Sequence, residues 1–304
     1  MPGRNVIDLR DLDPLEIERI LDRAVAFRDT PPLRQALRDV AVVNLFFEPS
    51  TRTLTSFVIA EQRLGADIVT LAPQHSSMAK GETLADTVQT LAAMGVRVIV
   101  TRHEESGFPY RVAEAFEGHV INAGDGAHAH PTQALLDILT LRDEFGEIDR
   151  LTVAIVGDVA NSRVARSNIT GLRLLGARII LVGPPTLVPD AFAELGLDIE
   201  RDLDSVLPHV DAVMLLRIQK ERIGSALIPS LAEYSSAYRM DKRRLRKLRP
   251  DAIVLHPGPY NRGTELTDDV VAWPNFRYAN QVGNGVPVRM AVLEYVIAGN
   301  RVPS

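Results

Sequence analysis

Three hydroxyl side chains and one arginine, reading STRT at 50–53, follow a short apolar run at 40–47. The run is β-branched and aromatic, so it predicts a buried strand, which Pro49 ends. The apolar segment after STRT closes at Gly65, which predicts a helix that begins at the hydroxyl cluster. Because helix N-termini carry unpaired N–H groups and a partial positive charge, they bind anions. The stretch 46–57 therefore predicts a phosphate site without the glycines of a Walker loop.

A simpler interpretation is that Ser50 or Thr51 only caps the helix, since both residue types are common N-caps. Arg52 favours the anion site. A cation in the first turn opposes the helix dipole, so it needs another reason to be there.

Strand-like and helix-like segments alternate through the first half of the chain, which predicts a parallel sheet. Ligands of such sheets gather at the carboxyl ends of the strands. Arg52, Arg102 and His130 each follow a predicted strand directly, and Gln133 stands just beyond His130. We expect these groups to share one crevice. The two arginines and the helix N–H groups, with Lys80 as a further candidate, fit a phosphate dianion.

A second alternating unit begins after the helical segment 134–145, and we place a domain boundary there. Its first turn presents Ser162 and Arg163 at a helix start, and Arg217 and Gln219 follow a later strand. Guanidinium groups bind carboxylates through two parallel hydrogen bonds, so two arginines suit a small dicarboxylate. The first turn reads GDxxxSR rather than GxGxxG, so a dinucleotide site has weak support.

The two units predict an α/β fold of two doubly wound parallel-sheet domains linked by helices. We assign 1–133 to the first domain and 147–280 to the second. The C-terminal segment 286–304 contains an amphipathic helix and is expected to return to the first domain.

No acid–base dyad, Ser/His/Asp set or metal cluster stands out in the sequence. The chemistry is therefore expected to rest on positioning and electrostatics, with His130 and Gln133 at the reacting group. We interpret Trp273 as a packing residue. Four further histidines lack a partner motif and are interpreted as structural or surface residues: His103, His119, His128 and His209.

The composition is that of a globular protein, with 46% hydrophobic and 24% charged residues. The net charge of −5 argues against a general affinity for nucleic acid. The basic run 239–249 is interpreted as a solvated helix face, with a nucleic-acid contact as the alternative. No apolar run reaches the ~18 residues of a membrane span, and the N-terminus lacks a signal-peptide core. Cysteine is absent, so we expect a cytoplasmic protein that binds neither membrane nor nucleic acid.

Six motifs, in order along nearly the whole chain, match the aspartate/ornithine carbamoyltransferase family. They are STRT at 50–53, SSMAKGETLADT at 76–87, the strand end at Arg102, HPTQ at 130–133, RIQKER at 217–222 and HPGP at 256–259. Ornithine-type members are expected to have a cysteine in the last of these loops, and this chain has none. The RxQxER run resembles the aspartate-binding loop, so the chain is similar to the members that use aspartate.

The resemblance implies transfer of the carbamoyl group of carbamoyl phosphate to the α-amino group of L-aspartate, without metal or organic cofactor. The products are N-carbamoyl-L-aspartate and phosphate, in pyrimidine (UMP) biosynthesis. The first domain would bind carbamoyl phosphate and the second aspartate. The departing phosphate would accept the amine proton, which accounts for the missing general base.

Matching positions imply a role for each motif residue. The phosphate would bind Ser50, Thr51, Arg52, Thr53 and Arg102. The carbamoyl group would contact Thr53, Arg102, His130 and Gln133, in a pocket shaped by Pro257, Gly258 and Pro259. Aspartate would bind Lys80, Arg163, Arg217 and Gln219. The catalytic set would be Arg52, Thr53, Lys80, Arg102, His130 and Gln133.

Family members are trimers, and Ser76 and Lys80 would reach into the site of the neighbouring chain. A regulatory chain or dihydroorotase is a further candidate partner. The family often has Arg and Glu where this chain has Leu54 and Val58. The alternatives are a transcarbamylase with another amine acceptor and a catalytically silent homologue that scaffolds a partner enzyme.

Overall fold

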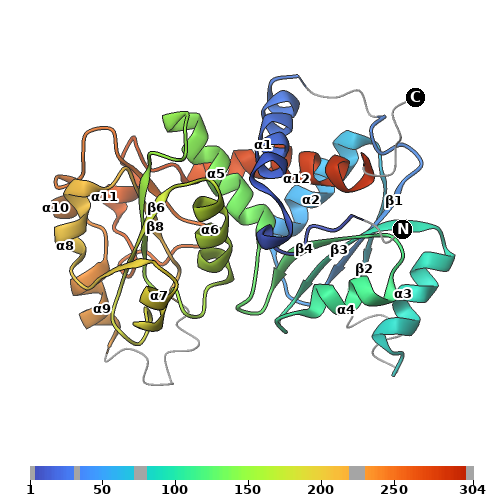
Figure 1. Ribbon diagram of the computed structural model, residues 1–304, viewed down its shortest axis with the longest axis horizontal. Helices are drawn as coiled ribbons and strands as arrows, with labels where there is room; N and C mark the ends of the chain where they lie inside the picture. Colours follow the sequence, from blue (N-terminus) through green and yellow to red (C-terminus); the bar gives the residue numbers. More distant parts are fainter. Residues whose placement is uncertain (1–3, 31–34, 72–80, 219–229, 299–304) are drawn as a thin grey trace. The chain divides into compact units, whose positions relative to one another are not determined.

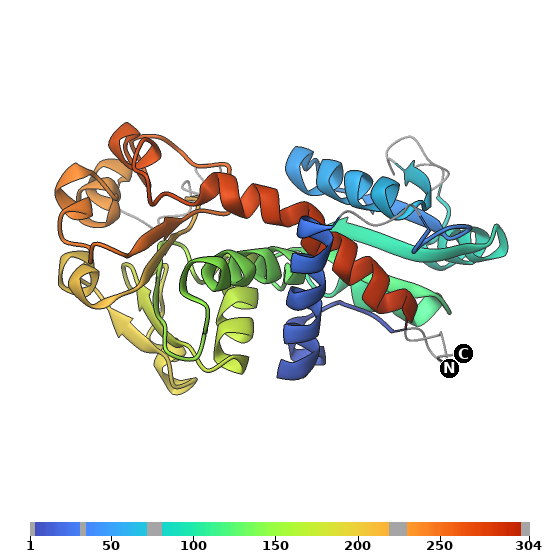
Figure 2. The same cartoon turned by 90° about the horizontal axis from the view of Figure 1, so that it is seen from above.

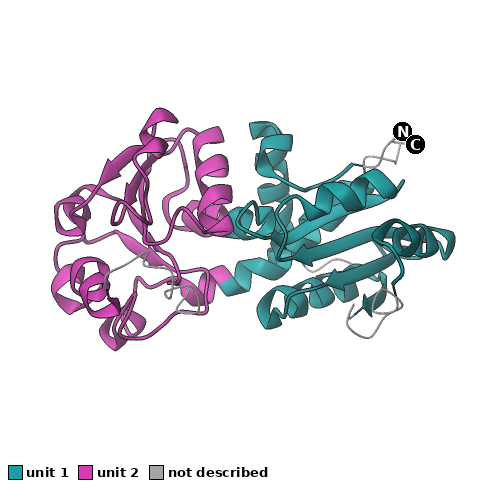
Figure 3. Cartoon of the chain, turned by 90° about the horizontal axis from the view of Figure 1, so that it is seen from below, with its two compact units in different colours: residues 1–136, 282–304 teal, residues 137–281 magenta. Residues whose placement is uncertain are grey.

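The computed structural model describes residues 4–30, 35–71, 81–218 and 230–298, and the chain divides into two compact units (Figure 1, Figure 3). Unit 1 comprises Met1–Leu136 and Val282–Ser304, and unit 2 comprises Asp137–Gln281. Two helices, α5 (Pro131–Phe145) and α12 (Tyr278–Ala298), carry the chain from one unit to the other. The end of the chain thus returns to unit 1, while the domain limits drawn from the sequence stay a prediction.

Unit 1 contains a parallel sheet of four strands in the order β2-β1-β3-β4. The elements of unit 1 as far as β4 are, in chain order, η1 (Leu9–Asp11), α1 (Pro14–Asp29), β1 (Ala41–Phe46), α2 (Thr51–Leu64), β2 (Asp67–Leu71), α3 (Leu84–Ala93), β3 (Val96–His103), α4 (Phe108–Ala115) and β4 (His119–Asp125). The chain winds outward from β1 to β2 and then crosses to β3 on the other side of β1. The winding direction therefore reverses between β1 and β3, where α/β sheets bind their ligands.

Alternate side chains of β1 face opposite layers of helices, as the two-residue period of a strand requires. Val43 and Leu45 pack in a buried cluster with residues of α3 and α4. Asn44 points to the other face, where its Nδ2 donates to Glu61 of α2 (2.7 Å). Figure 1 shows α3 and α4 on one side of this sheet and α2 on the other.

The pattern of Asp13, Pro14 and Glu16 predicts a helix start, and α1 begins there, with Asp13 as N-cap and Glu16 completing a capping box. The same Glu16 accepts a hydrogen bond from Tyr295 Oη of α12 (2.6 Å), and Arg23 forms an ion pair with Glu294 (2.5 Å). These contacts place α1 beside the last part of α12 within unit 1 (Figure 2). The C-terminal helix is thus fixed to residues near the start of the chain.

Unit 2 contains a parallel sheet of five strands in the order β7-β6-β5-β8-β9. Its elements after α5 are β5 (Thr152–Val156), α6 (Arg163–Leu174), β6 (Arg178–Val182), α7 (Ala191–Glu194), β7 (Asp198–Glu200), α8 (Leu203–Val206), η4 (Leu207–His209), β8 (Ala212–Leu215), α9 (Leu231–Tyr238), α10 (Lys242–Leu245), β9 (Ile253–Leu255) and α11 (Asp268–Val271). The winding direction reverses between β5 and β8. The fold class predicted from the sequence is confirmed.

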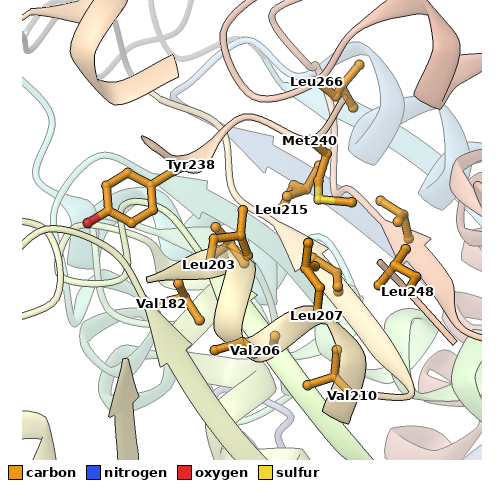
Figure 4. Packing of buried hydrophobic residues seen from close by; sticks show 14 of the residues in the cluster. Val182, Leu203, Val206, Leu207, Val210, Leu215, Tyr238, Met240, Leu248 and Leu266 are labelled. Atoms are coloured by element: carbon orange, nitrogen blue, oxygen red, sulfur yellow. The ribbon is translucent and has the colours of Figure 1, made fainter. Parts of the chain in front are cut away.

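The core of unit 2 joins residues that lie far apart in the sequence. Val182 at the end of β6 and Leu215 at the end of β8 pack in one buried cluster with Leu203, Leu207 and Met240 (Figure 4). Trp273 is partly buried against this cluster, which confirms it as a packing residue. Within the described residues, no helix is both long enough and apolar enough to cross a membrane.

Three details differ from the elements predicted by the sequence. Strand β3 runs through Arg102 to His103, so Arg102 lies inside the strand end rather than after it. The sequence predicts a helix around 111–116, but α4 begins already at Phe108, because Gly107 adopts φ +87° and turns the chain into the helix. Strand β7 was not predicted, since three residues reading DIE carry no apolar signal.

The interpretation of the basic run 239–249 as a solvated face is wrong for one residue. Arg244 is only 4% exposed, and its guanidinium donates to the carbonyls of Ser236, Ala237 and Arg239 and to the Asp204 carboxylate. Three of these acceptors stand at the C-terminal end of α9, where carbonyls lack helical partners. Burial alone would raise the pKa of Asp204, but the hydrogen bonds from Arg244 and Arg243 outweigh it and lower that pKa. Arg244 thus caps the C-terminal end of α9 with a buried side chain.

Candidate active site

The turn between β1 and α2 leaves its hydroxyl groups available. Ser50 is the N-cap residue of α2, and its carbonyl accepts the first helical bond from Leu54 N (3.1 Å), but its side chain makes no capping hydrogen bond. Thr51 and Arg52 are exposed, whereas Thr53 is buried. The interpretation of this cluster as a simple cap is therefore wrong. The turn keeps the donors that an anion needs.

Arg102 stands directly beside this turn. It is the register partner of Phe46 at the end of β1, and its carbonyl accepts from Phe47 N (2.9 Å). Its guanidinium lies 3.1 Å from Glu48 Oε2 and donates to the carbonyl of Ala123 (3.2 Å). The side chain of Arg102 is thus held between the carboxyl ends of β1 and β4. Sequence reasoning missed Glu48, although its position beside STRT was a signal.

His130 and Gln133 lie at the first turn of α5. The carbonyl of His130 accepts from the N–H groups of Gln133 (3.0 Å) and Ala134 (3.2 Å), so the two site residues belong to one helical turn. Both side chains are almost fully buried, with 4% and 9% of their surface exposed. Polar groups in such surroundings act more strongly on a bound substrate than they would in water.

Asp125 builds the loop that leads to His130. Its buried carboxylate accepts from the N–H groups of Gly107 (2.6 Å) and Ala129 (3.1 Å) and from Asn122 Nδ2 (2.8 Å). The Nδ1 atom of His128 lies 2.9 Å from the same carboxylate, so His128 has a structural role as expected. The sequence offered a weak signal for Asp125, an acid in a glycine-rich stretch, and we did not predict it.

The predicted anion groups of unit 2 also stand where the winding reverses. Arg163 is the first residue of α6, and Ser162 before it caps the helix through Ala165 N (3.1 Å). Arg217 follows β8, whose last residue, Leu215, pairs with Val156 at the end of β5. The two arginines therefore extend from neighbouring strands of one sheet. Ser162 has a capping role and is not needed as an anion ligand.

The loop after β9 is shaped by its own backbone. The Nδ1 atom of His256 accepts from Gly258 N (2.9 Å), and the N–H of His256 donates to Gln281 (2.9 Å). Gly258 has φ +66°, and a Cβ there would lie 2.8 Å from the ring of Tyr278. Only glycine fits this position, so backbone groups rather than a side chain define the surface there.

Two family models match the chain almost end to end. One is described as aspartate/ornithine carbamoyltransferase, carbamoyl-P binding domain, and matches residues 4–143. The other is the Asp/Orn binding domain of the same family and matches residues 149–296. The chain belongs to the aspartate/ornithine carbamoyltransferase family.

Relatives within this family share nearly the full length. The aspartate carbamoyltransferase catalytic subunit of Salinispora arenicola is 50% identical over 305 residues, 98% of this chain and 99% of the relative. The subunit of Syntrophobacter fumaroxidans is 49% identical over 294 residues, 95% of this chain and 96% of the relative. The crystal structure of Trypanosoma cruzi aspartate transcarbamoylase with carbamoyl phosphate and aspartate is 33% identical and covers 96% of each chain, with a TM-score of 0.87.

Three of the residues expected from the family motifs, Ser76, Lys80 and Gln219, lie outside the described residues. The others stand in two groups, one in each unit. In unit 1, the residues from 50–53, Arg102, His130 and Gln133 lie at the carboxyl ends of β1, β3 and β4. Across the described ranges, no group of His, Asp and Glu side chains could hold a metal ion.

Proposed function

We propose that this member of the family transfers the carbamoyl group of carbamoyl phosphate to the α-amino group of L-aspartate, which yields N-carbamoyl-L-aspartate and phosphate for pyrimidine (UMP) biosynthesis. One observation carries the proposal. Each unit of the chain places arginines at the point where its sheet reverses its winding, Arg52 and Arg102 in unit 1 and Arg163 and Arg217 in unit 2. The names of the most similar relatives and the ligands of the T. cruzi structure support it.

Unit 1 takes carbamoyl phosphate in this proposal. The phosphate binds the hydroxyls at 50–53, the N–H groups of the first turn of α2, and the guanidinium groups of Arg52 and Arg102. A dianion bound by two arginines gains charge-assisted hydrogen bonds, which are roughly twice as strong as neutral ones. The ion pair with Glu48 holds the Arg102 guanidinium in one orientation at the strand ends.

The carbamoyl carbon becomes the electrophile through the groups that contact its oxygen and its amide. Thr53, Arg102 and His130 donate to the oxygen as negative charge develops on it, and Gln133 holds the amide. The aspartate nitrogen forms a bond to the carbamoyl carbon, the bond from that carbon to the phosphate oxygen breaks, and the phosphate takes the proton from the amine. Preorganised donors of this kind supply the largest share of catalysis in related acyl transfers.

Unit 2 takes L-aspartate. Arg163, Arg217 and Gln219 bind its carboxylates, and Lys80 completes the site. The backbone of Pro257, Gly258 and Pro259, which also belongs to unit 2, shapes the pocket of the carbamoyl group. The arginines select a dicarboxylate, because their guanidinium groups would repel the positively charged side chain of ornithine.

The proposal includes the assembly and the location. The active form is a cytoplasmic homotrimer in which Ser76 and Lys80 serve the site of the neighbouring chain. A regulatory chain or dihydroorotase would bind to this trimer as a further partner.

A colour assay for carbamoylated amines tests the proposal directly. The purified chain should produce N-carbamoyl-aspartate from carbamoyl phosphate and L-aspartate, and no citrulline from L-ornithine. Activity with ornithine or another amine, but not with aspartate, would assign the other acceptor. No product with any amine, from a folded and trimeric chain, would instead indicate a silent scaffold.

A further inference from the structure

Glu265 is a buried residue of the loop that follows β9 in unit 2, and its carboxylate faces the loop that follows β8. Only 1% of its surface is exposed. One carboxylate oxygen accepts from Ile218 N (2.8 Å) and from Asn261 Nδ2 (2.8 Å). The other accepts from Asn261 N (2.5 Å) and lies 3.8 Å from His256 Nε2. All four neighbours are nitrogen atoms, and they come from the loops that follow β8 and β9.

This environment requires an ionised carboxylate. The Nδ1 atom of His256 accepts from Gly258 N, so the ring proton sits on Nε2, the nitrogen that faces Glu265. Every group around the two oxygens is therefore a donor. Burial alone would raise the pKa of Glu265, but the nearby His256 ring and the hydrogen bonds from Asn261 and Ile218 outweigh it and lower the pKa. An amide in place of the carboxylate would direct its own N–H groups at donors.

The peptide of Ile218 is held from both sides. Its N–H donates to Glu265, and its carbonyl accepts from Asn261 Nδ2 (3.2 Å). Ile218 lies between Arg217 and Gln219, the two proposed carboxylate ligands on this loop. Fixing its peptide fixes the direction in which the chain leaves β8.

The same carboxylate lies 3.8 Å from the ring of His256, at the start of the loop after β9. The ring of His256 holds Gly258, whose neighbours shape the proposed substrate pocket. Gln281 holds the N–H of His256 and in turn donates to Asp137 of α5 (2.7 Å). Glu265 thus joins the loop with Arg217 to a loop that is itself anchored to two helices.

We propose that Glu265 is a positioning residue for the acceptor amino acid: it fixes the peptide of Ile218, so that Arg217 beside it points at a substrate carboxylate. This inference rests on the proposed function. Glu265 itself does not touch the substrate, because only 1% of its surface is exposed. Its loss should weaken acceptor binding selectively, since the proposed phosphate ligands belong to unit 1.

The test compares Glu265→Gln with Glu194→Gln, which makes the same change at an exposed position of α7 in the same unit. Glu265→Gln should raise KM for aspartate at least about tenfold, since a lost hydrogen bond to a charged group is worth at least that factor. Binding of carbamoyl phosphate, measured by calorimetry, should stay within about twofold of the parent protein. Glu194→Gln should match the parent protein in both measurements. An unchanged KM for aspartate, or equal weakening of both ligands, would overturn the inference.

Hydrogen exchange separates this inference from the proposed function. Exchange of the Ile218 amide should accelerate at least about tenfold in Glu265→Gln and stay unchanged in Glu194→Gln. This measurement needs no turnover. If the chain proves inactive toward aspartate, the proposed function is contradicted, and hydrogen exchange still tests whether Glu265 holds the peptide of Ile218. Unchanged exchange would show that Glu265 does not hold the loop. If Glu265→Gln does not fold, Asn261→Ala, which removes the bond to the Ile218 carbonyl, carries both measurements with the same expected directions.

Discussion

The two arginines of unit 1 are held in different ways. Arg102 reaches Glu48 and the carbonyl of Ala123, so its guanidinium is fixed before substrate arrives. Arg52 is exposed in the first turn of α2, where it opposes the helix dipole. This placement is unfavourable for the helix alone, and it becomes favourable when an anion neutralises both the arginine and the helix terminus.

Arg52→Ala should therefore lower turnover by at least ~10²-fold, because removal of one preorganised donor costs about 3–4 kcal/mol in comparable sites. Steady-state assays with saturating substrates measure the loss. Arg63→Ala, an exposed position in the last turn of the same helix, should keep the parent activity. Parent-like turnover in Arg52→Ala would contradict its role.

Arg217→Ala tests the division of the ligands between the units. The substitution should weaken aspartate strongly and leave carbamoyl phosphate binding nearly unchanged, because the proposed phosphate ligands lie in unit 1. Calorimetry measures the two affinities, one with carbamoyl phosphate and one with a non-reactive dicarboxylate in place of aspartate. Equal weakening of both ligands would show that the two-site division is wrong.

Glu61 predicts how the stability of unit 1 responds to pH. It is fully buried on α2, and burial raises its pKa to about 7, although the hydrogen bond from Asn44 acts in the opposite direction. Glu61 Oε1 and Asn44 Oδ1 have no hydrogen-bond partner. A proton on Glu61 supplies a donor to this pair of side chains, whose two unpartnered atoms are both acceptors. Glu61 is therefore expected to fold as a neutral acid.

The sign follows from proton binding. The folded state binds the Glu61 proton more tightly than the unfolded state, so the contribution of Glu61 is fully present below the unfolded pKa. It is lost as pH rises toward about 7. Glu61→Gln keeps a donor without titrating, so its free energy of unfolding relative to the parent should increase from pH 4 to pH 8 by about 3 kcal/mol. Denaturant unfolding at both pH values measures this, with exposed Glu117→Gln as the control. Parallel pH dependences in all three proteins would contradict a neutral Glu61.

At the scale of single elements, α2 combines two tasks. Its first turn carries the proposed anion donors, while its later turns bury Phe57, Ala60 and Leu64 against the sheet. The helix ends at Gly65, which adopts φ +84° as a left-handed C-cap. The position of the anion donors therefore depends on packing further along the same helix.

Leu54 and Val58 are half-buried and lie one turn apart on α2, so their side chains are neighbours. An unpaired glutamate in Val58→Glu should destabilise the chain, by less than the ~3 kcal/mol of a fully buried charge. Leu54→Arg should cost less, because its long stem carries the charge toward solvent. The double substitution should recover part of the loss, with a coupling energy of about 0.5–3 kcal/mol. Aspartate turnover should stay close to the parent value, since Arg52 and Thr53 are unchanged.

Denaturant unfolding of the four proteins, all at the same protein concentration, measures this cycle. A coupling energy of zero would show that the two side chains do not act as a pair.

At the scale of the whole molecule, the proposed site needs more than one chain. Mixing inactive Lys80→Ala chains with inactive Arg52→Ala chains should restore part of the activity. A mixed trimer then contains composite sites with both residues intact. Mixing Arg52→Ala with Arg102→Ala should restore none, because both residues belong to the same unit of one chain. No recovery in the first mixture, after subunit exchange has been verified by mass, would argue against a shared site.

Much of the fold was already determined by local patterns in the sequence. The β-branched runs predicted the strands, because a buried parallel strand must be apolar on both faces. The caps at Asp13 and Gly65 were also predicted, since each depends on neighbouring residues alone. The strand and the helix start on either side of Pro49 were predicted for the same reason. The helix start is indicated by neighbouring residues alone, namely Ser50, Thr51 and Arg52.

Contacts between distant residues were decided only by the tertiary structure. Glu48 holds Arg102, Asp125 accepts a hydrogen bond from Gly107 N, and Glu265 holds the peptide beside Arg217. No sequence spacing indicates these contacts, because each joins loops that only the sheet order brings together. Arg244 shows the same effect, since a basic run gives no sign that one of its members is buried against carbonyls. The sequence therefore determined which residues can carry the chemistry, and the packing of strands and loops decided which residues hold them, because a buried charge is stable only where donors or acceptors surround it.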